Sequence, residues 1–122
     1  MTTICIPLRV ASKKNSRRNY GRISLPSKAY VKFHENAAIY LLPYKRLHFT
    51  TPVEIKIVYS IKGKYHQDID NVVSSVFDCL TDYGIIADDD LCHQVTAVKK
   101  PGQVDWLCEI NIRELEAWLF TY

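Results

Sequence analysis

The chain has 122 residues, of which 48% are hydrophobic and 24% charged, and its formal net charge is +3. These values suit one domain spanning residues 1–122 and exclude a disordered or fibrous protein. No apolar run approaches the roughly 20 residues of a membrane-spanning helix, and the start lacks the features of a secretory signal, so we expect a cytoplasmic protein without a membrane partner.

The first third of the chain predicts one strand, one loop and one helix. An imperfect alternation of apolar and polar residues over 3–9 suits a short strand near a sheet edge. The polar, basic stretch 11–24 is expected to be an exposed loop, at most with a short extended segment. Ser27 would cap a helix whose apolar residues repeat at helical spacing up to Leu41, and Pro43 is expected to stop that helix.

The middle of the chain carries the clearest periodic patterns. Alternation over 53–60, with Val58 as the one apolar residue in the otherwise polar set, predicts a strand, and Gly63 marks the turn after it. From Ile69 the apolar residues form one helical stripe, and Gly84 ends this second helix. The polar face of the helix is expected to carry Asn71, Ser74, Ser75 and Asp78.

Two strands, over 94–98 and 104–112, are predicted near the end of the chain. Pro101 and Gly102 suggest a turn that joins them into a hairpin, and the tail 113–122 could form a short helix. Strands and helices in this mixture predict an α+β fold, a two-layer domain with a small mixed sheet and two main helices packed on it.

The cysteines argue against a zinc module. They are widely separated, and none forms the closely spaced pair of a structural zinc site. We expect them to be buried free thiols of a reduced compartment. They are Cys5, Cys79, Cys92 and Cys108.

The distribution of charge is more informative than its sum. Six basic residues and no acid fall between Arg9 and Arg22, whereas seven acids fall between Asp68 and Asp90. Basic side chains bind phosphates and clustered carboxylates bind hard metal ions, so the pattern suggests a polyanion processed with a metal.

Asp68-Ile69-Asp70-Asn71 is the segment most indicative of chemistry. It follows a predicted strand and turn and opens the second predicted helix, where free backbone N–H groups and the helix dipole favour ionised carboxylates. The pair would therefore be available to a cation. The alternative is plain helix capping, a common role for aspartate at this position.

A second acidic cluster, Asp88-Asp89-Asp90, follows the second predicted helix, and the returning chain is expected to bring it beside the first cluster. Ligation by oxygen alone suits magnesium or manganese. The alternative is a solvated turn.

These motifs resemble the RusA family of Holliday junction resolvases, particularly its phage-type members. Residues 12–18 look like the family's N-terminal Ser/Asn/Arg loop and 26–30 like the start of its first helix. Residues 68–71 match the family's Asp-x-Asp-Asn motif and 88–89 its later Asp-Asp pair. The resemblance runs from about residue 4 to residue 112.

The resemblance implies a magnesium-dependent endonuclease that resolves four-way junctions with paired symmetric nicks and acts as a homodimer without a small-molecule cofactor. Manganese would be a substitute ion. The metal-binding and catalytic carboxylates would be Asp68, Asp70 and Asp89, with Asn71, Ser74 and Asp88 beside them. The residues that bind DNA would be Lys13, Lys14, Asn15, Arg17, Arg18, Lys62 and Lys64.

One position departs from the family pattern. Members usually carry a lysine four residues after the second motif aspartate, and this chain has Ser74 there. A lysine one helical turn on would reach back to a phosphate or leaving group, and serine is too short to do so. His66 and Gln67 also replace typical arginines, and either Lys62 or Lys64 could compensate.

The sequence leaves three alternatives open. The protein could bind junctions with weak or no cleavage because of Ser74. It could hold a structural ion and have no role with nucleic acid. It could also be a nuclease whose substrates are flaps or replication forks.

Overall fold

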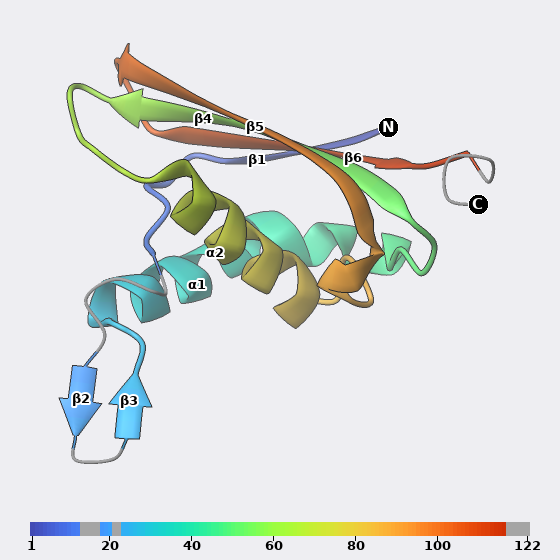
Figure 1. Ribbon diagram of the computed structural model, residues 1–122, viewed down its shortest axis with the longest axis horizontal. Coiled ribbons are helices and arrows are strands. Elements are labelled where there is room, and N and C mark those ends of the chain that lie inside the picture. The colour runs from blue at the N-terminus through green and yellow to red at the C-terminus, as the bar shows by residue number, and fades with distance from the viewer. Residues whose placement is uncertain (13–17, 21–22, 117–122) are drawn as a thin grey trace.

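The chain forms two layers, a sheet and a pair of helices that cover one of its faces (Figure 1). The computed structural model describes residues 1–12, 18–20 and 23–116. A mixed sheet with helices packed on it confirms the predicted α+β fold. Within those ranges no helix is both long and apolar enough to cross a membrane.

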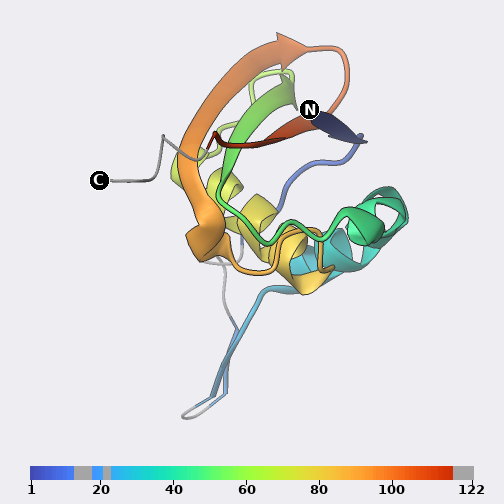
Figure 2. The same ribbon diagram turned by 90° about the vertical axis from the view of Figure 1, so that its right-hand side faces the viewer.

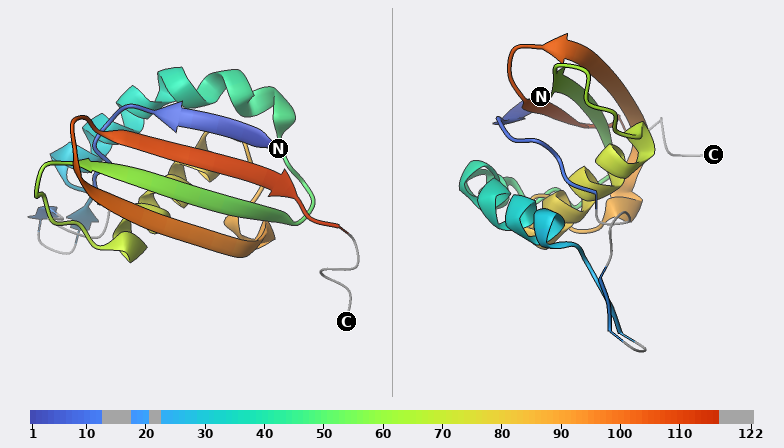
Figure 3. Two further views of the ribbon diagram at one scale, coloured as in Figure 1. Left: turned by 90° about the horizontal axis from the view of Figure 1, so that it is seen from above. Right: turned by 90° about the vertical axis from the view of Figure 1, so that its left-hand side faces the viewer.

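The main sheet contains four strands among the described residues, and Figure 3 shows them from above. Their order is β1 (Thr2–Ile6), β6 (Leu107–Glu114), β4 (Val53–Lys62) and β5 (Cys92–Gln103). Neighbouring strands run antiparallel except β4 and β5, which are parallel. Parallel neighbours need a long crossover, which here includes a helix.

The sequence pattern explains why β4 lies inside the sheet. Its alternate residues from Val53 to Ile61 are buried against the helices, so one complete face of the strand belongs to the core. Pairing on both edges satisfies its backbone groups.

The predicted hairpin between the last two strands is wrong. β5 and β6 lie on opposite sides of β4, and Pro101 and Gly102 belong to the irregular end of β5 rather than to a turn. Residues 104–106 make the connection. Because strands are about 4.8 Å apart, those three residues can cross the roughly 10 Å that separates the two neighbours of β4.

The first helix follows the sequence prediction closely. α1 (Lys28–Leu41) begins after Ser27, whose hydroxyl accepts a hydrogen bond from the Tyr30 amide at 3.1 Å. The α-helix ends at Leu41, but a 3-10 helix, η1 (Leu42–Leu47), continues through Pro43. Proline is tolerated there because an N–H in a first helical turn needs no helical partner.

The second helix, α2 (Ile69–Asp82), joins β4 to β5 and runs back along the sheet. Ser75, expected on its polar face, is fully buried, whereas Ile69 is exposed. The helix is covered by the sheet on one side and by α1 on another, so more of its surface is buried than a single apolar stripe predicts.

Backbone hydrogen bonds hold the segment after α2 beside the residues that precede β4. Gly84, at φ +72°, turns the chain, and the Phe49 amide then donates to the Ile85 carbonyl at 2.8 Å. A short 3-10 helix, η2 (Asp89–Leu91), leads into β5. The first residue of β5 pairs with Val53, so η2 lies at the beginning of the parallel strand pair.

The predicted loop 11–24 contains a small hairpin. β2 (Arg18–Tyr20) pairs antiparallel with β3 (Ile23–Leu25), and this pair extends away from the two-layer body (Figure 2). β3 corresponds to the short extended segment expected around Ile23, whereas β2 was not predicted, because a strand of three residues is too short to show a periodic pattern.

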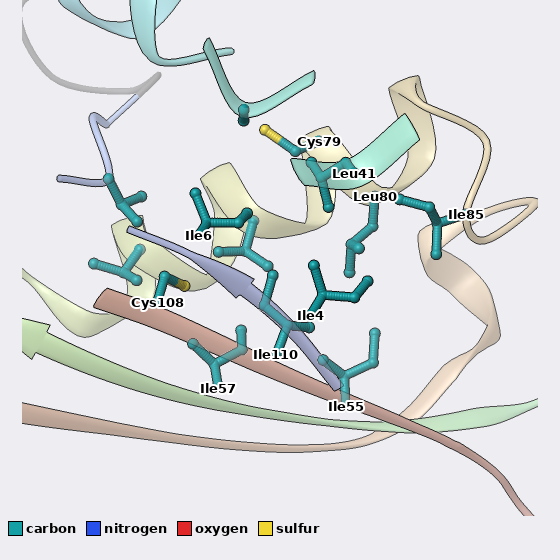
Figure 4. Close-up of a cluster of buried hydrophobic side chains, with 14 of the residues drawn as sticks. Ile4, Ile6, Leu41, Ile55, Ile57, Cys79, Leu80, Ile85, Cys108 and Ile110 are labelled. Atoms are coloured by element: carbon teal, nitrogen blue, oxygen red, sulfur yellow. The ribbon is translucent and has the colours of Figure 1, made fainter. Parts of the chain in front are cut away.

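The core fills the space between the sheet and the helices (Figure 4). Cys79 and Cys108 are buried free thiols, as expected, but Cys5 is exposed and Cys92 only half-buried. At the chain end, Arg113 and Glu114 belong to β6 rather than to the predicted helix, and residues 117–122 lie outside the described part. The largest fully buried side chains are Ile4, Ile6, Leu41, Ile55, Ile57, Tyr59, Ile61, Leu80, Ile85, Ile86, Ile110 and Ile112.

Candidate functional site

Asp68 and Asp70 lie where the chain passes from β4 into α2, at the carboxyl end of the parallel strand pair. Open sheets commonly bind ligands at this end of their strands. Asp68 is the N-cap residue of α2, with extended backbone angles (φ −76°, ψ 132°), and Asp70 is in the first turn. Both side chains are exposed.

The carboxylate of Asp68 does not cap the helix. Its backbone carbonyl accepts the first helical hydrogen bond, from the Val72 amide at 3.2 Å, but its side chain makes no capping bond. This geometry removes the plain capping explanation for Asp68, and its carboxylate oxygens remain at a helix N-terminus that favours negative charge.

A cavity of about 270 Å³ opens beside this carboxylate. Its walls come from the chain after β1, from the start of α1 and from the connection between β4 and α2. They include Arg9, Tyr65, His66, Asp68 and Asn71. The first motif therefore borders a cavity that is also lined by a cationic side chain.

A buried tyrosine holds the residue that precedes Asp68. The Tyr59 hydroxyl accepts a hydrogen bond from the Val10 amide (3.0 Å) and donates one to Gln67 Oε1 (2.5 Å), while Gln67 Nε2 donates to the Val10 carbonyl (2.5 Å). Burial raises the pKa of Tyr59, so its hydroxyl stays protonated and able to donate. This triangle links three separate segments at the entrance to α2.

Arg9 is the first of the six basic residues noted in the sequence, and it lines the same cavity. Its guanidinium lies over the Tyr65 ring, 4.2 Å from the centroid, and also donates to the Tyr65 hydroxyl. Tyr65 meets Trp106 edge to face, with centroids 5.7 Å apart. Such stacking fixes a cation at the cavity wall.

Several lysines lie at this end of the sheet, among them Lys62, Lys64 and Lys99. Lys62 ends β4, Lys64 follows in the turn, and both are exposed. Lys99 comes from β5, and its Nζ donates to the Gln67 carbonyl at 2.7 Å. Ser74, which stands where the resemblance led us to expect a lysine, is half-buried one turn after Asp70.

The second acidic cluster has a different local structure. The Asp88 carboxylate accepts a hydrogen bond from the Asp90 amide (2.9 Å) and caps η2. That bond lowers the pKa of Asp88, with a smaller contribution from a hydrogen bond with Asp89. The same side-chain bond to Asp88 raises the pKa of Asp89, which is therefore the carboxyl that takes up a proton first.

Within one chain the two clusters are not neighbours, contrary to our expectation from the sequence. Asp68 and Asp70 begin α2, whereas Asp89 follows its far end (Figure 1). A helix of 14 residues is about 20 Å long, because each residue rises about 1.5 Å. Among the described residues, no three or more His, Cys, Asp or Glu side chains are grouped so that they could hold a metal.

Most of the predicted DNA-binding arm lies outside the described residues, namely Lys13, Lys14, Asn15 and Arg17. Arg18 begins β2, the first strand of the projecting hairpin. The hairpin therefore begins at the last residue of the predicted arm.

Both acidic clusters, Arg9 and Lys99 fall within a region that matches a known protein family. The family model described as Endodeoxyribonuclease RusA matches residues 7–113. The chain belongs to this RusA family. A similar curated protein, the crossover junction endodeoxyribonuclease RusA of Escherichia coli O139:H28, is 26% identical over 113 residues, or 93% of this chain and 94% of that protein.

Membership of the RusA family makes the chain a structure-specific endodeoxyribonuclease and confirms the resemblance carried by the sequence motifs. Sequence reasoning found both acidic clusters. It missed Tyr59, Tyr65 and Lys99, which lie near the first acidic motif, since a tyrosine or a lysine carries no local signal of contact with a residue elsewhere in the chain.

Proposed function

We propose that the protein is a magnesium-dependent nuclease that resolves four-way DNA junctions by paired symmetric nicks. The observation that carries the proposal is that the Asp68 carboxylate makes no capping bond to α2. It lies two residues before Asp70, after the carboxyl end of β4, and borders a cavity lined mainly by polar residues. This position suits a residue that serves a ligand rather than the helix. Because junction DNA is found there, we also propose a cytoplasmic location.

Asp68, Asp70 and Asp89 would hold the metal. Their chemistry fits a hard divalent cation, because carboxylate oxygens are the ligands that magnesium and manganese prefer. When bound, the ion supplies charge stabilisation at the phosphodiester and lowers the pKa of water. Asn71, Ser74 and Asp88 stand beside these ligands in the chain.

The distance along α2 leads us to propose that each metal site is shared between two subunits of a homodimer. A two-fold axis perpendicular to α2 makes the two copies of the helix antiparallel. The partner's Asp89 can then approach Asp68 and Asp70, which the roughly 20 Å helix prevents within one chain. Two sites related by a two-fold axis also suit two symmetric cuts.

A mixing experiment tests the shared site. Asp70→Asn and Asp89→Asn are each expected to abolish cleavage. In a mixed dimer, one site receives both mutations and the other receives neither, so mixing should restore about a quarter of the wild-type nicking, with single rather than paired nicks. If the mixture stays inactive while mixed dimers are shown to form, each site is built within one subunit.

Basic side chains would bind the phosphate backbone of the DNA that enters the acidic site. We propose that Arg9 acts at the cavity wall and that the predicted arm and connection residues grip the flanking phosphates. Affinity should therefore fall steeply with salt. The arm and connection residues are Lys13, Lys14, Asn15, Arg17, Arg18, Lys62 and Lys64.

Cleavage of a labelled mobile junction, compared with linear duplex, tests the main proposal. With magnesium, the wild type should give paired symmetric nicks in the junction, and Asp70→Asn should bind the junction without cleaving it. Glu35→Gln, a change on the exposed surface of α1, is the matched control and should cleave normally. Preferred cleavage of flaps or forks would change the substrate assignment but not the class of enzyme.

The second candidate function is junction binding with little or no cleavage. Ser74 favours it, since a half-buried serine cannot supply the positive charge expected one turn after Asp70. Tight junction binding without nicks in the wild type, together with cleavage by Ser74→Lys, would establish this alternative. Normal wild-type turnover would remove it.

A further inference from the structure

Lys99 reaches the acidic site from a strand that no sequence motif connects with it. Its Nζ lies 2.7 Å from the Gln67 carbonyl, and that carbonyl belongs to the peptide bond joining Gln67 to Asp68. A lysine ammonium is therefore held one residue from the first metal-binding candidate, although the two positions are 31 residues apart in sequence.

The sheet register directs Lys99 towards the site. Lys99 pairs with Tyr59, and paired residues of neighbouring strands point to the same face. Tyr59 is buried on the face that the helices cover, so Lys99 projects towards the start of α2. Lys100 pairs with Ser60 and projects from the opposite face.

The peptide that anchors Lys99 is itself held in place. The hydroxyl of Tyr59 and the carbonyl of Val10 both bond the Gln67 side chain. An ammonium group has three donors, and the Gln67 carbonyl uses one of them. The remaining donors can meet an anion that approaches Asp68.

We propose that Lys99 contacts the phosphate that is cut and supplies the positive charge that Ser74 cannot supply from α2. This inference rests on the proposed nuclease function. A cation at that phosphate stabilises the negative charge that develops as its bond breaks. The positive charge at the phosphate then comes from β5 rather than from α2, so cleavage does not require a lysine at position 74.

The first test is the single-turnover cleavage rate on a four-way junction with magnesium. Lys99→Met should lower the rate about 100-fold, the usual effect of removing one charge-stabilising donor. Lys100→Met, the neighbouring control, should stay within about threefold of the wild type, since only the general phosphate attraction changes. Adding Ser74→Lys to Lys99→Met should recover at least about tenfold, because a charge on α2 would serve the same phosphate.

A second test does not depend on cleavage and separates phosphate contact from a purely structural role. Junction affinity is measured without metal for a set of junctions in which single phosphates near the branch point are neutral methylphosphonates. One such change should weaken the wild type and Lys100→Met about tenfold, but Lys99→Met less than about twofold. That coupling would support the contact even if the wild type failed to cleave.

The proposal is overturned if no neutral phosphate distinguishes Lys99→Met from the wild type. It is also overturned if Lys99→Met cleaves at the wild-type rate, or if Lys99→Met and Lys100→Met are equally impaired. A different result would overturn the proposed function itself: a wild type that neither binds nor cuts junctions in preference to linear duplex.

Discussion

Replacing Tyr59 by phenylalanine tests the hydrogen-bonded triangle that supports the acidic site. The change removes one oxygen atom from a side chain that is only 1% exposed. Two hydrogen bonds are lost, one from the Val10 amide and one to Gln67 Oε1. The ring keeps its packing, so the effect belongs to the hydroxyl.

The expected loss of stability follows from the hydrogen bonds that Val10 and Gln67 lose. Each hydrogen bond contributes about 1 kcal/mol net, and a buried amide left without a partner costs about 1 to 3 kcal/mol. Val10 is also only 1% exposed, so its amide cannot regain water. We expect Tyr59→Phe to lower the free energy of unfolding by about 2 to 3 kcal/mol, or roughly 10 °C in melting temperature.

Urea unfolding of Tyr59→Phe and Tyr65→Phe provides the assay. Tyr65 also bears a hydrogen-bonded hydroxyl, but its side chain is 42% exposed and water can replace the lost bond. Tyr65→Phe should therefore change stability by less than about 0.5 kcal/mol. A loss below about 0.5 kcal/mol in Tyr59→Phe, or equal losses in both variants, would show that the Tyr59 hydroxyl does not stabilise the fold through these bonds.

The remaining predictions concern a turn, the thiols and the second acidic pair. Gly84→Ala should lower the free energy of unfolding by about 1 kcal/mol in a denaturant titration, because φ is +72° there; no loss would mean that the turn readily rearranges. Ellman's reagent should label exposed Cys5 rapidly and Cys108 only after unfolding, since burial raises the pKa of the Cys108 thiol to about 12; equal labelling rates would contradict the fold. A carboxyl with a raised pKa loses its charge first as pH falls, so Asp88→Asn, which removes the main cause of the raised pKa of Asp89, should move the acid limb of cleavage to lower pH. An unchanged limb would show that Asp89 does not set it.

The amino-acid sequence alone predicts the features that depend on neighbours along the chain. Ser27 caps α1, alternation around Ile55 and Ile57 predicts β4, and the helical stripe after Asp68 predicts α2. The order and spacing of the acidic motifs also indicate the family to which the chain belongs. These properties follow from local hydrogen bonding and from side-chain periodicity, which a single segment displays in full.

The way in which distant segments meet is visible only in the folded chain. β5 and β6 are separated by β4 because β4 is buried and needs a partner on each edge, a demand that no turn residue reveals. The length of α2 keeps Asp89 away from Asp68, and the register of β5 turns Lys99, not Lys100, towards the site. Such relations depend on which strands pair and in which register. The pairing is chosen by burial of the whole core, so it cannot be deduced from any one segment.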